Sequence, residues 1–296
     1  MNLTIVYITN RDEPRLDWFT ASLMLQTHSQ PIILVVSPHN RHGVFPKPTV
    51  WSGPSRLTKQ DWWSASNARN TGICLCQTDW IAFVDDRCVL MPGWLDCIRA
   101  AMSRPFPYVL CGTYEKRINM TVENGVIINP GTIIGRDSRA EYCETHYVKP
   151  HGMKPPFKAP GEWTYGCSIA LPLEWALNIG GFEEEHCDGL SGEDYVFGKM
   201  LENNGYPVMF EPRMKMVEDR TEGQCGPIAI RRDKGVSPND KSHAALDKLK
   251  GLKHTLNRFD IRKVRADVLA GKPWPPPSGS DKDWFDGQPL SEMTPT

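Results

Sequence analysis

The sequence predicts an α/β fold in which helices flank a mostly parallel β-sheet. Two apolar, β-branched runs, Leu3–Thr9 and Ile32–Val36, are typical of buried strands. Between them, Leu16, Phe19 and Leu23 recur at the spacing of one helix face. A strand, a helix and a second strand joined by short connections are typical of a parallel βαβ unit, because parallel neighbours need a crossover connection.

The alternation of helices and strands continues along the chain. In order, we expect a helix from Asp61 to about Gln77, a strand at residues 80–84, a helix with Pro92 in its first turn and a strand at residues 108–113. Residues 119–163 alternate short apolar stretches with Gly and Pro turns, and this pattern does not fix an order of elements.

The second half of the chain supplies further elements of both kinds. We expect a strand at residues 165–171, a short helix at 172–178, a loop and helix over 192–204 and a strand at 206–210. Asn239 or Asp240 then caps a helix with Ala245, Leu249, Leu252 and Leu256 on one face, which gives the fold a C-terminal helical extension. The residues after Ala270 are rich in Pro and are expected to form an extended, flexible tail.

Cysteine usage and hydropathy limit the class of protein. The nine cysteines contain no CxxC pair, which is typical of reduced thiols in a cytoplasmic protein. No stretch approaches the ~20 apolar residues of a membrane helix, and Met1–Thr9 lacks the basic head and cleavage site of a signal peptide. We therefore expect a soluble, cytoplasmic protein, in the cytoplasm of the host cell if the protein is viral.

Charge is unevenly distributed along the chain. The formal net charge is −1, yet eleven Lys and Arg against five Asp between residues 231 and 267 give that segment +6. The remainder of the chain therefore carries −7. A basic cluster of this kind can neutralise phosphates, although a solvated helix face is the alternative.

Asp85 and Asp86 directly follow the apolar strand at residues 80–84, so they lie at the carboxyl end of a central strand. Open α/β sheets bind their ligands at this edge. Paired carboxylates there suit a divalent metal ion and the diphosphate that it neutralises. The alternative is a helix N-cap beside a solvated neighbour.

Other short motifs stand in a fixed order around this pair, namely Ala68-Arg-Asn-Thr-Gly72, Val84-Asp-Asp-Arg87, Gly93-Trp-Leu95, Gly181-Phe182 and Gly192-Glu-Asp194. In this order they resemble the family 2 and related glycosyltransferases of the GT-A fold, over roughly residues 1–212. The resemblance implies a Rossmann-like nucleotide-sugar-binding half at 1–115 and an acceptor-binding half of the same domain at 116–230. A basic flap and helix at 231–270 and the Pro-rich tail at 271–296 complete the chain.

The resemblance also implies roles for individual residues on the donor side. The co-substrate would be a nucleotide-sugar, with Thr9 and Arg11 near the nucleotide base and Arg69 close to the nucleotide. Asp85 would contact the ribose and a divalent metal, Mn²⁺ or Mg²⁺. The second predicted strand ends in Ser37-Pro38-His39 instead of the acidic cluster common in the family, so the identity of the base does not carry over.

On the acceptor side, the resemblance makes Asp194 the general base and Glu193 a supporting residue. A hydroxyl that attacks an anomeric carbon in line needs a nearby carboxylate to accept its proton. A single displacement of this kind would invert the anomeric centre. The alternative for both residues is a helix N-terminal charge that complements the helix dipole.

Arg87 departs from the family pattern, which usually has a metal-binding carboxylate at this position. Either Asp86 takes over the coordination of the metal, or the Arg87 cation replaces part of the metal's role against the diphosphate. The need for a metal is therefore open at this point.

The polar, basic segment 231–243 is a candidate for the C-terminal flap that closes over the donor in related enzymes. We expect His243 to be a ligand of the metal, and Lys234 and Lys241 to approach the phosphates. A solvated histidine is the alternative, and His186 with Asp188 is a weaker candidate pair.

Aromatic residues suggest where the acceptor lies. Trp163 and Tyr165 are placed to stack on an acceptor, whereas Trp62 and Trp63 are expected in the core. The acceptor is a glycan or, because of the +6 segment, DNA with hydroxymethylated bases, which some phage-type transferases use.

Two other classes of function compete with a glycosyltransferase. A nucleotidyltransferase can share the nucleotide-binding half, but it normally has a Gly-rich phosphate loop, and residues 9–14 contain no glycine. A non-catalytic nucleic-acid-binding or sugar-binding protein could keep the same fold. The intact Glu193-Asp194 pair argues against that class, and Arg87 argues mildly for it.

Overall fold

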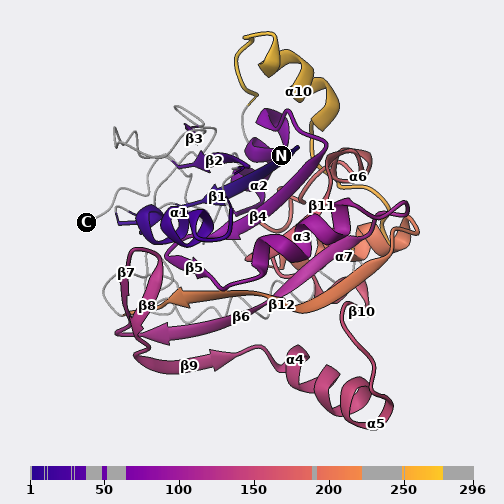
Figure 1. Cartoon of the computed structure of the whole chain (residues 1–296). Helices are drawn as coiled ribbons and strands as arrows, with labels where there is room; N and C mark the ends of the chain where they lie inside the picture. Colours follow the sequence, from indigo (N-terminus) through magenta and orange to yellow (C-terminus); the bar gives the residue numbers. More distant parts are fainter. Residues whose placement is uncertain are drawn as a thin grey trace, which may run out of the picture.

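The structure is a computed structural model that describes residues 2–9, 11, 13–27, 29, 31–37, 49–51, 65–188, 192–221, 249 and 251–275. Within these residues, one large mixed sheet is covered by helices, and a small hairpin forms a second sheet (Figure 1). The predicted α/β class is confirmed.

The first half of the large sheet is parallel, as the sequence predicts. Its elements are β1 (Leu3–Ile8), α1 (Leu16–Met24), β2 (Ile32–Val36), β3 (Thr49–Trp51), α2 (Ala65–Leu75) and β4 (Trp80–Asp85). β1 pairs in parallel with both β2 and β4, and β3 pairs in parallel with β2. These strands read as continuous apolar runs because helices cover both faces of a parallel sheet. The predicted start of the second helix at Asp61 lies outside the described residues.

The second half of the sheet is mixed. Its main elements are β5 (Cys88–Leu90), α3 (Trp94–Met102), β6 (Val109–Ile118), β11 (Ser168–Pro172), α6 (Leu173–Asn178), α7 (Glu193–Asn203) and β12 (Val208–Asp219). β11 runs antiparallel to β4 and β6, whereas β12 runs parallel to β6. The strand predicted at residues 206–210 is only the start of β12, which continues through a bulge between Glu211 and Lys215. Pro92 precedes α3 and does not lie in its first turn as predicted.

Residues 119–163, for which the sequence pattern does not predict an order of elements, form a hairpin and an arm. Its elements are β7 (Thr121–Glu123), β8 (Val126–Asn129), β9 (Thr132–Arg136), α4 (Ser138–Cys143), a π-helical turn at Glu144–Val148, α5 (Lys149–His151), β10 (Phe157–Lys158) and a 3₁₀ turn at Gly161–Trp163. The segment from α4 to α5 projects from the body of the molecule (Figure 1). The strand order of the large sheet is β10-β12-β6-β11-β4-β1-β2-β3, with β5 beside β12 and β9 beside β6.

The C-terminal part of the described chain differs from the predicted helix. Residues 252–260 are not helical, so Leu252 and Leu256 do not share a helix face with Leu249. The backbone there bonds to the turn at the end of α6 instead, since the Thr255 amide donates to the Ile179 carbonyl at 3.0 Å. A helix that the sequence analysis did not predict, α10 (Ile261–Leu269), follows and packs on α2. The predicted caps Asn239 and Asp240 lie outside the described residues.

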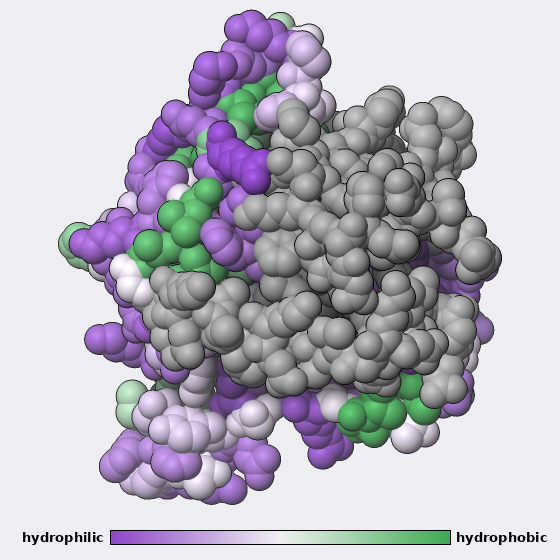
Figure 2. All heavy atoms as spheres, turned by 180° about the vertical axis from the view of Figure 1, so that it is seen from behind, coloured by the Kyte–Doolittle hydropathy of each residue, from purple (hydrophilic) through white to green (hydrophobic). Residues whose placement is uncertain are grey.

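The core lies on both faces of the sheet because side chains alternate along each strand. On β1, Val6 packs on one face, and Ile5 and Tyr7 pack on the other. Hydrophilic residues make up most of the described surface in Figure 2, and hydrophobic residues form small separate patches there. Among the described residues, the structure has no helix with the length and apolar character needed to cross a membrane.

Gly72 allows α2 to pack closely on the central strand. A Cβ atom at this position would lie 2.5 Å and 2.7 Å from the two methyl carbons of Val6. Both residues are in the interior of the sheet–helix contact, so a larger side chain has no free direction in which to move. The last residue of the Ala68–Gly72 motif is therefore required by helix packing.

We predict that Gly72→Ala lowers the free energy of unfolding. Overpacking of a dense core costs about 1–3 kcal/mol, which exceeds the gain of about 1 kcal/mol at most that alanine brings to a helix. Urea denaturation measures the difference. Gly251→Ala is the matched control, because a Cβ there has no neighbour within 4 Å. Equal stability of the Gly72 variant and the wild-type protein would contradict the predicted overlap.

Candidate functional site

A pocket of about 190 Å³ opens where the two halves of the sheet meet. Its lining includes three acidic and two basic side chains, and the full set is Asp85, Tyr114, Lys116, Tyr165, Cys167, Asp194, Glu218 and Arg220. Asp85 ends β4, and Asp194 lies in the first turn of α7. A larger hollow of about 460 Å³ lies at the opposite end of β4, beside Asp79 and Trp80, and contains none of the predicted site residues.

Arg69 of α2 connects the two halves of the site. Its guanidinium donates to Asp85 Oδ1 and to Glu193 Oε1, each at 2.8 Å. Burial alone would lower the pKa of Arg69, but Asp85, Glu193 and Asp194 together raise it above its ordinary value. A Cβ at Gly166 would lie 2.2 Å from Arg69 Nη2, so this position has room only for glycine beside the guanidinium.

The start of α2 is held by a residue of the segment between α6 and α7. Asp188 accepts hydrogen bonds from the backbone amides of Ser66 and Asn67, at 2.9 Å and 3.1 Å. A carboxylate satisfies amides that have no partner within the helix at its N-terminus. His186 pairs with Glu183 at 3.1 Å. Neither Asp188 nor His186 lines the pocket, so the structure does not bring this weaker candidate pair to the site.

Asp194 is held in a fixed orientation at the pocket. Gly192 adopts φ 88°, a left-handed conformation that glycine accepts at no steric cost, and so turns the chain sharply into α7. The Asp194 carboxylate accepts hydrogen bonds from the amides of Gly166 at 3.1 Å and Tyr195 at 2.8 Å. Burial and the neighbouring Glu193 raise the pKa of Asp194 to about 6, against the opposing effect of Arg69. This pKa suits a base that works near neutral pH.

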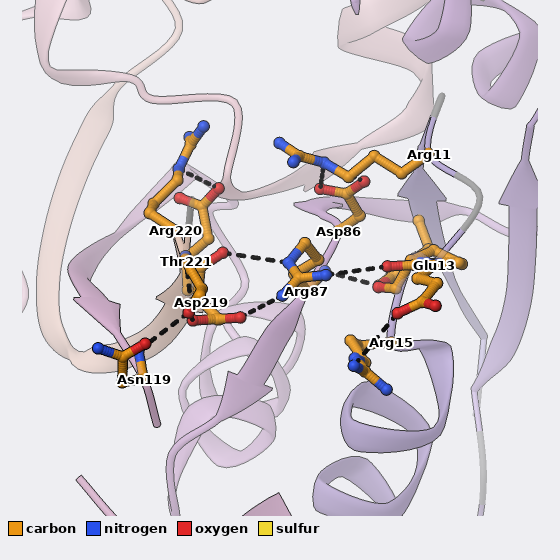
Figure 3. Close-up of polar contacts among 12 residues, drawn as sticks. Arg11, Glu13, Arg15, Asp86, Arg87, Asn119, Asp219, Arg220 and Thr221 are labelled. Carbon is orange, nitrogen blue, oxygen red and sulfur yellow. Dashed lines mark hydrogen bonds and ion pairs between the residues drawn. The ribbon is translucent and has the colours of Figure 1, made fainter. Parts of the chain in front are cut away.

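The Asp86 carboxylate contacts residues that follow β1. It accepts a hydrogen bond from Thr9 Oγ1 at 2.6 Å and forms an ion pair with Arg11 Nε at 3.0 Å. The structure therefore brings Thr9, Arg11 and Asp86 together. Figure 3 shows the contact of Arg11 with Asp86. Burial raises the pKa of Asp86, and Arg11 and Thr9 partly offset the rise. Asp86 does not line the pocket, although it follows Asp85 directly.

Arg87 points away from the pocket. The residue has a left-handed backbone with φ 54°, and it is 2% exposed. Its guanidinium forms an ion pair with Asp219 and donates to the Glu13 carbonyl at 3.2 Å (Figure 3). Arg87 therefore links the end of β12 to the segment after β1, and its guanidinium does not line the pocket.

The two predicted aromatic residues have different surroundings. Tyr165 lines the pocket and lies on the guanidinium of Arg139, 3.9 Å from the ring centroid. Trp163 packs edge-on against Phe210 and Tyr142 and is not part of the pocket lining. Lys234, Lys241 and His243, like Trp62 and Trp63, lie outside the described residues.

Several residues at the pocket were not predicted from the sequence. Lys116 and Tyr114 come from β6, Glu218 comes from β12, and Arg220 follows it. Burial raises the pKa of Glu218 to about 7, with Arg220 opposing the rise and Asp85 adding to it. The regular alternation of Met214 and Met216 with charged residues is the signal that could have extended the predicted strand to this point.

The chemistry of the donor set fits one divalent cation. In the part of the chain that the structure covers, no three His, Cys, Asp or Glu side chains gather as a metal site. Mg²⁺ bound at a substrate phosphate usually keeps several waters and binds one or two protein carboxylates. Asp85 and Glu218 both line the pocket and would supply these carboxylates, although Asp85 is paired with Arg69 and Glu218 with Arg220. Asp86, which Thr9 and Arg11 engage, does not line the pocket.

We predict that Arg69→Gln destabilises the fold strongly. Removal of one partner from a buried ion pair costs about 3–5 kcal/mol, since the remaining charges stay buried without compensation. Lys263→Gln is the control, because the Lys263 side chain is exposed and its pair with Asp267 is expected to contribute little to stability. Thermal unfolding of the two variants compares these effects. Equal losses would show that the bridge to Asp85 and Glu193 has no special weight.

A known family matches the part of the chain that holds the first three of the five motifs. Residues 56–162 match the model of glycosyl transferase family 2. The structure is similar to that of GalNAc-T7 with UDP, GalNAc and Mn²⁺, with 11% identity and a TM-score of 0.53 over 92% of this chain. This chain spans 59% of the length of GalNAc-T7.

A second similar structure is the mannosyltransferase PcManGT from Pyrobaculum calidifontis in complex with GDP-Man and Mn²⁺. It has 14% identity and a TM-score of 0.51, over 91% of this chain and 74% of PcManGT. A search of curated protein sequences found no match. The chain therefore has the GT-A fold, and it is similar to the family 2 glycosyltransferases over residues 56–162.

Proposed function

We propose that this protein transfers a glycosyl group from a nucleotide-sugar to an acceptor hydroxyl, with inversion at the anomeric carbon. The observation that carries the proposal is that Asp85 and Asp194 line the same pocket, while Arg69 is held between Asp85 and Glu193. A donor-side carboxylate and a base of suitable pKa are then fixed relative to each other, as a displacement in line requires.

The donor lies on the side of β1 and β4 in this proposal. Thr9 and Arg11, which hold Asp86, are at the end of β1, where the nucleotide would bind. Asp85 faces the ribose and, with Glu218, a divalent cation. When bound, such a cation would offset the negative charge of the diphosphate. One similar structure contains UDP and GalNAc and the other contains GDP-Man, so UDP and GDP are the first candidate nucleotides.

The acceptor hydroxyl is deprotonated by Asp194. As its oxygen forms a bond to the anomeric carbon, the bond from that carbon to the diphosphate oxygen breaks, and the electron pair leaves with the diphosphate. The proton passes to the Asp194 carboxylate. The amides of Gly166 and Tyr195 orient this carboxylate, and Tyr165 offers an aromatic surface at the same pocket.

The acceptor is a glycan or DNA with hydroxymethylated bases. The described part of the basic segment gives no particular support to DNA, because most of its described cations have partners within the chain. Arg262 pairs with Glu174, Lys263 pairs with Asp267, and Arg265 donates to the Cys76 carbonyl. The alternative of a nucleotidyltransferase has no specific feature of the pocket in its favour.

A panel of nucleotide-sugars tests the function. We would measure donor hydrolysis, and transfer to glycans and to hydroxymethylated DNA, each with and without Mn²⁺. The proposal expects turnover of at least one donor and transfer to one acceptor class. Absence of nucleotide binding and of turnover throughout the panel would overturn it.

We predict that Asp194→Asn lowers kcat by about 10²–10⁴-fold, the usual contribution of a general base. Donor affinity should change little, because Asp194 acts on the acceptor. Steady-state kinetics and donor titration separate the two quantities. Asp96→Asn is the control, since its carboxylate is 71% exposed and lies outside the pocket. An equal loss of donor affinity in the Asp194 variant would place this residue in donor binding.

We predict that kcat/KM rises with pH through about 6. The raised pKa of Asp194 means that the carboxyl is protonated, and so inactive as a base, below about 6. It becomes ionised and active above that pH. A pH–rate profile between pH 5 and 8 measures the effect. An activity that stays constant down to pH 5 would contradict the role of Asp194 as the base.

A further inference from the structure

We infer that Lys116 neutralises the departing diphosphate, whether or not a metal ion is bound beside it. This role rests on the proposed function and adds a catalytic residue that the sequence motifs do not contain. As the bond between the anomeric carbon and the diphosphate oxygen breaks, negative charge develops on that oxygen. Lys116 donates hydrogen bonds to the diphosphate and keeps its proton throughout the step.

The other cations near the pocket are already engaged with carboxylates. Arg11 pairs with Asp86, Arg69 with Asp85 and Glu193, Arg87 with Asp219, and Arg220 with Glu218. An arginine that approached a diphosphate would have to leave a buried or half-buried carboxylate without its partner. Such a loss is costly in a site of low dielectric.

Lys116 is the exception among these cations. Its ammonium lies over the ring of Tyr114, 5.0 Å from the centroid. Within the described part of the chain, no carboxylate forms an ion pair with it. A lysine ammonium is a compact charge with three donors on a flexible stem, so it can follow an anion as that anion departs.

The sheet fixes the position of Lys116. In the pairing of β6 with β12, Lys116 lies opposite Glu218, and in the pairing of β6 with β9 it lies opposite Gly135. Tyr114, two positions earlier on β6, lines the same pocket. A cation held by paired strands on both sides is in place before the reaction starts, which is where electrostatic stabilisation is most effective.

The charge of the pocket shows why such a cation is needed. Asp85, Asp194 and Glu218 all line it, and each repels an incoming or departing diphosphate when ionised. Glu218 and Arg220 offset each other. Among the described residues that line the pocket, Lys116 is then the cation available to the phosphates, whether or not a metal is bound at Asp85 and Glu218.

Ligand binding without metal tests this role separately from catalysis. We would titrate wild-type protein and Lys116→Met in EDTA with inorganic pyrophosphate, with UDP, GDP, ADP, CDP and dTDP, and with the matching nucleosides. We expect the variant to bind pyrophosphate and the preferred nucleoside diphosphate about 10–100-fold more weakly, as the loss of a charged hydrogen bond implies. Nucleoside affinity should not change.

Two further variants complete the experiment. Lys116→Arg keeps the charge and should restore most of the affinity for the diphosphate. Lys158→Met is the matched control, because Lys158 is an exposed lysine on strand β10 of the same sheet and lies outside the pocket. It should bind as the wild-type protein does.

The remaining outcomes separate this role from the proposed function. Equal affinity of the wild-type protein and Lys116→Met for pyrophosphate and nucleoside diphosphate would overturn the role of Lys116 alone. Binding by the wild-type protein only when Mn²⁺ is added would also overturn it. A wild-type protein that binds none of the nucleotides, with or without Mn²⁺, would overturn the proposed function as well.

Discussion

The site depends on the contact of one arginine with two carboxylates. Arg69 lies on α2, Asp85 ends β4, and Glu193 begins α7, so a single buried guanidinium joins three elements from both halves of the chain. Departure of the cation would leave two partly buried carboxylates without their shared partner, which is costly. The relative placement of Asp85 and Glu193 is therefore set by the geometry of one planar side chain.

Neighbouring groups make this contact possible. Gly166 has no side chain that would occupy the space of the guanidinium, and its amide holds the Asp194 carboxylate. Asp188 satisfies the first amides of α2, the helix that carries Arg69. Asp194 and Arg69 are thus positioned by the same short segments. A fixed geometry of this kind is what lets a base act on a hydroxyl without a large entropic cost.

Some of these residues could be predicted from the sequence and others could not. Asp85 follows an apolar strand, and Asp194 follows a glycine at a helix start, so local signals locate both. Lys116 and Glu218 come together only because β6 and β12 pair, and a single sequence does not show which distant strands are neighbours. The direction of the Arg87 side chain depends on a left-handed backbone, which the sequence of the motif does not reveal.

The arginine at the third motif position and the acidic residue on β12 are two parts of one arrangement. The Arg87 guanidinium holds Asp219, and the Asp219 amide donates to the Arg87 carbonyl at 3.0 Å. Adjacent residues on a strand point to opposite faces, so anchoring Asp219 on one side leaves Glu218 on the side of the pocket. The pocket therefore receives the carboxylate of Glu218 and not the cation of Arg87. Arg87 acts on the charge of the pocket indirectly, because it anchors the strand end from which Glu218 projects.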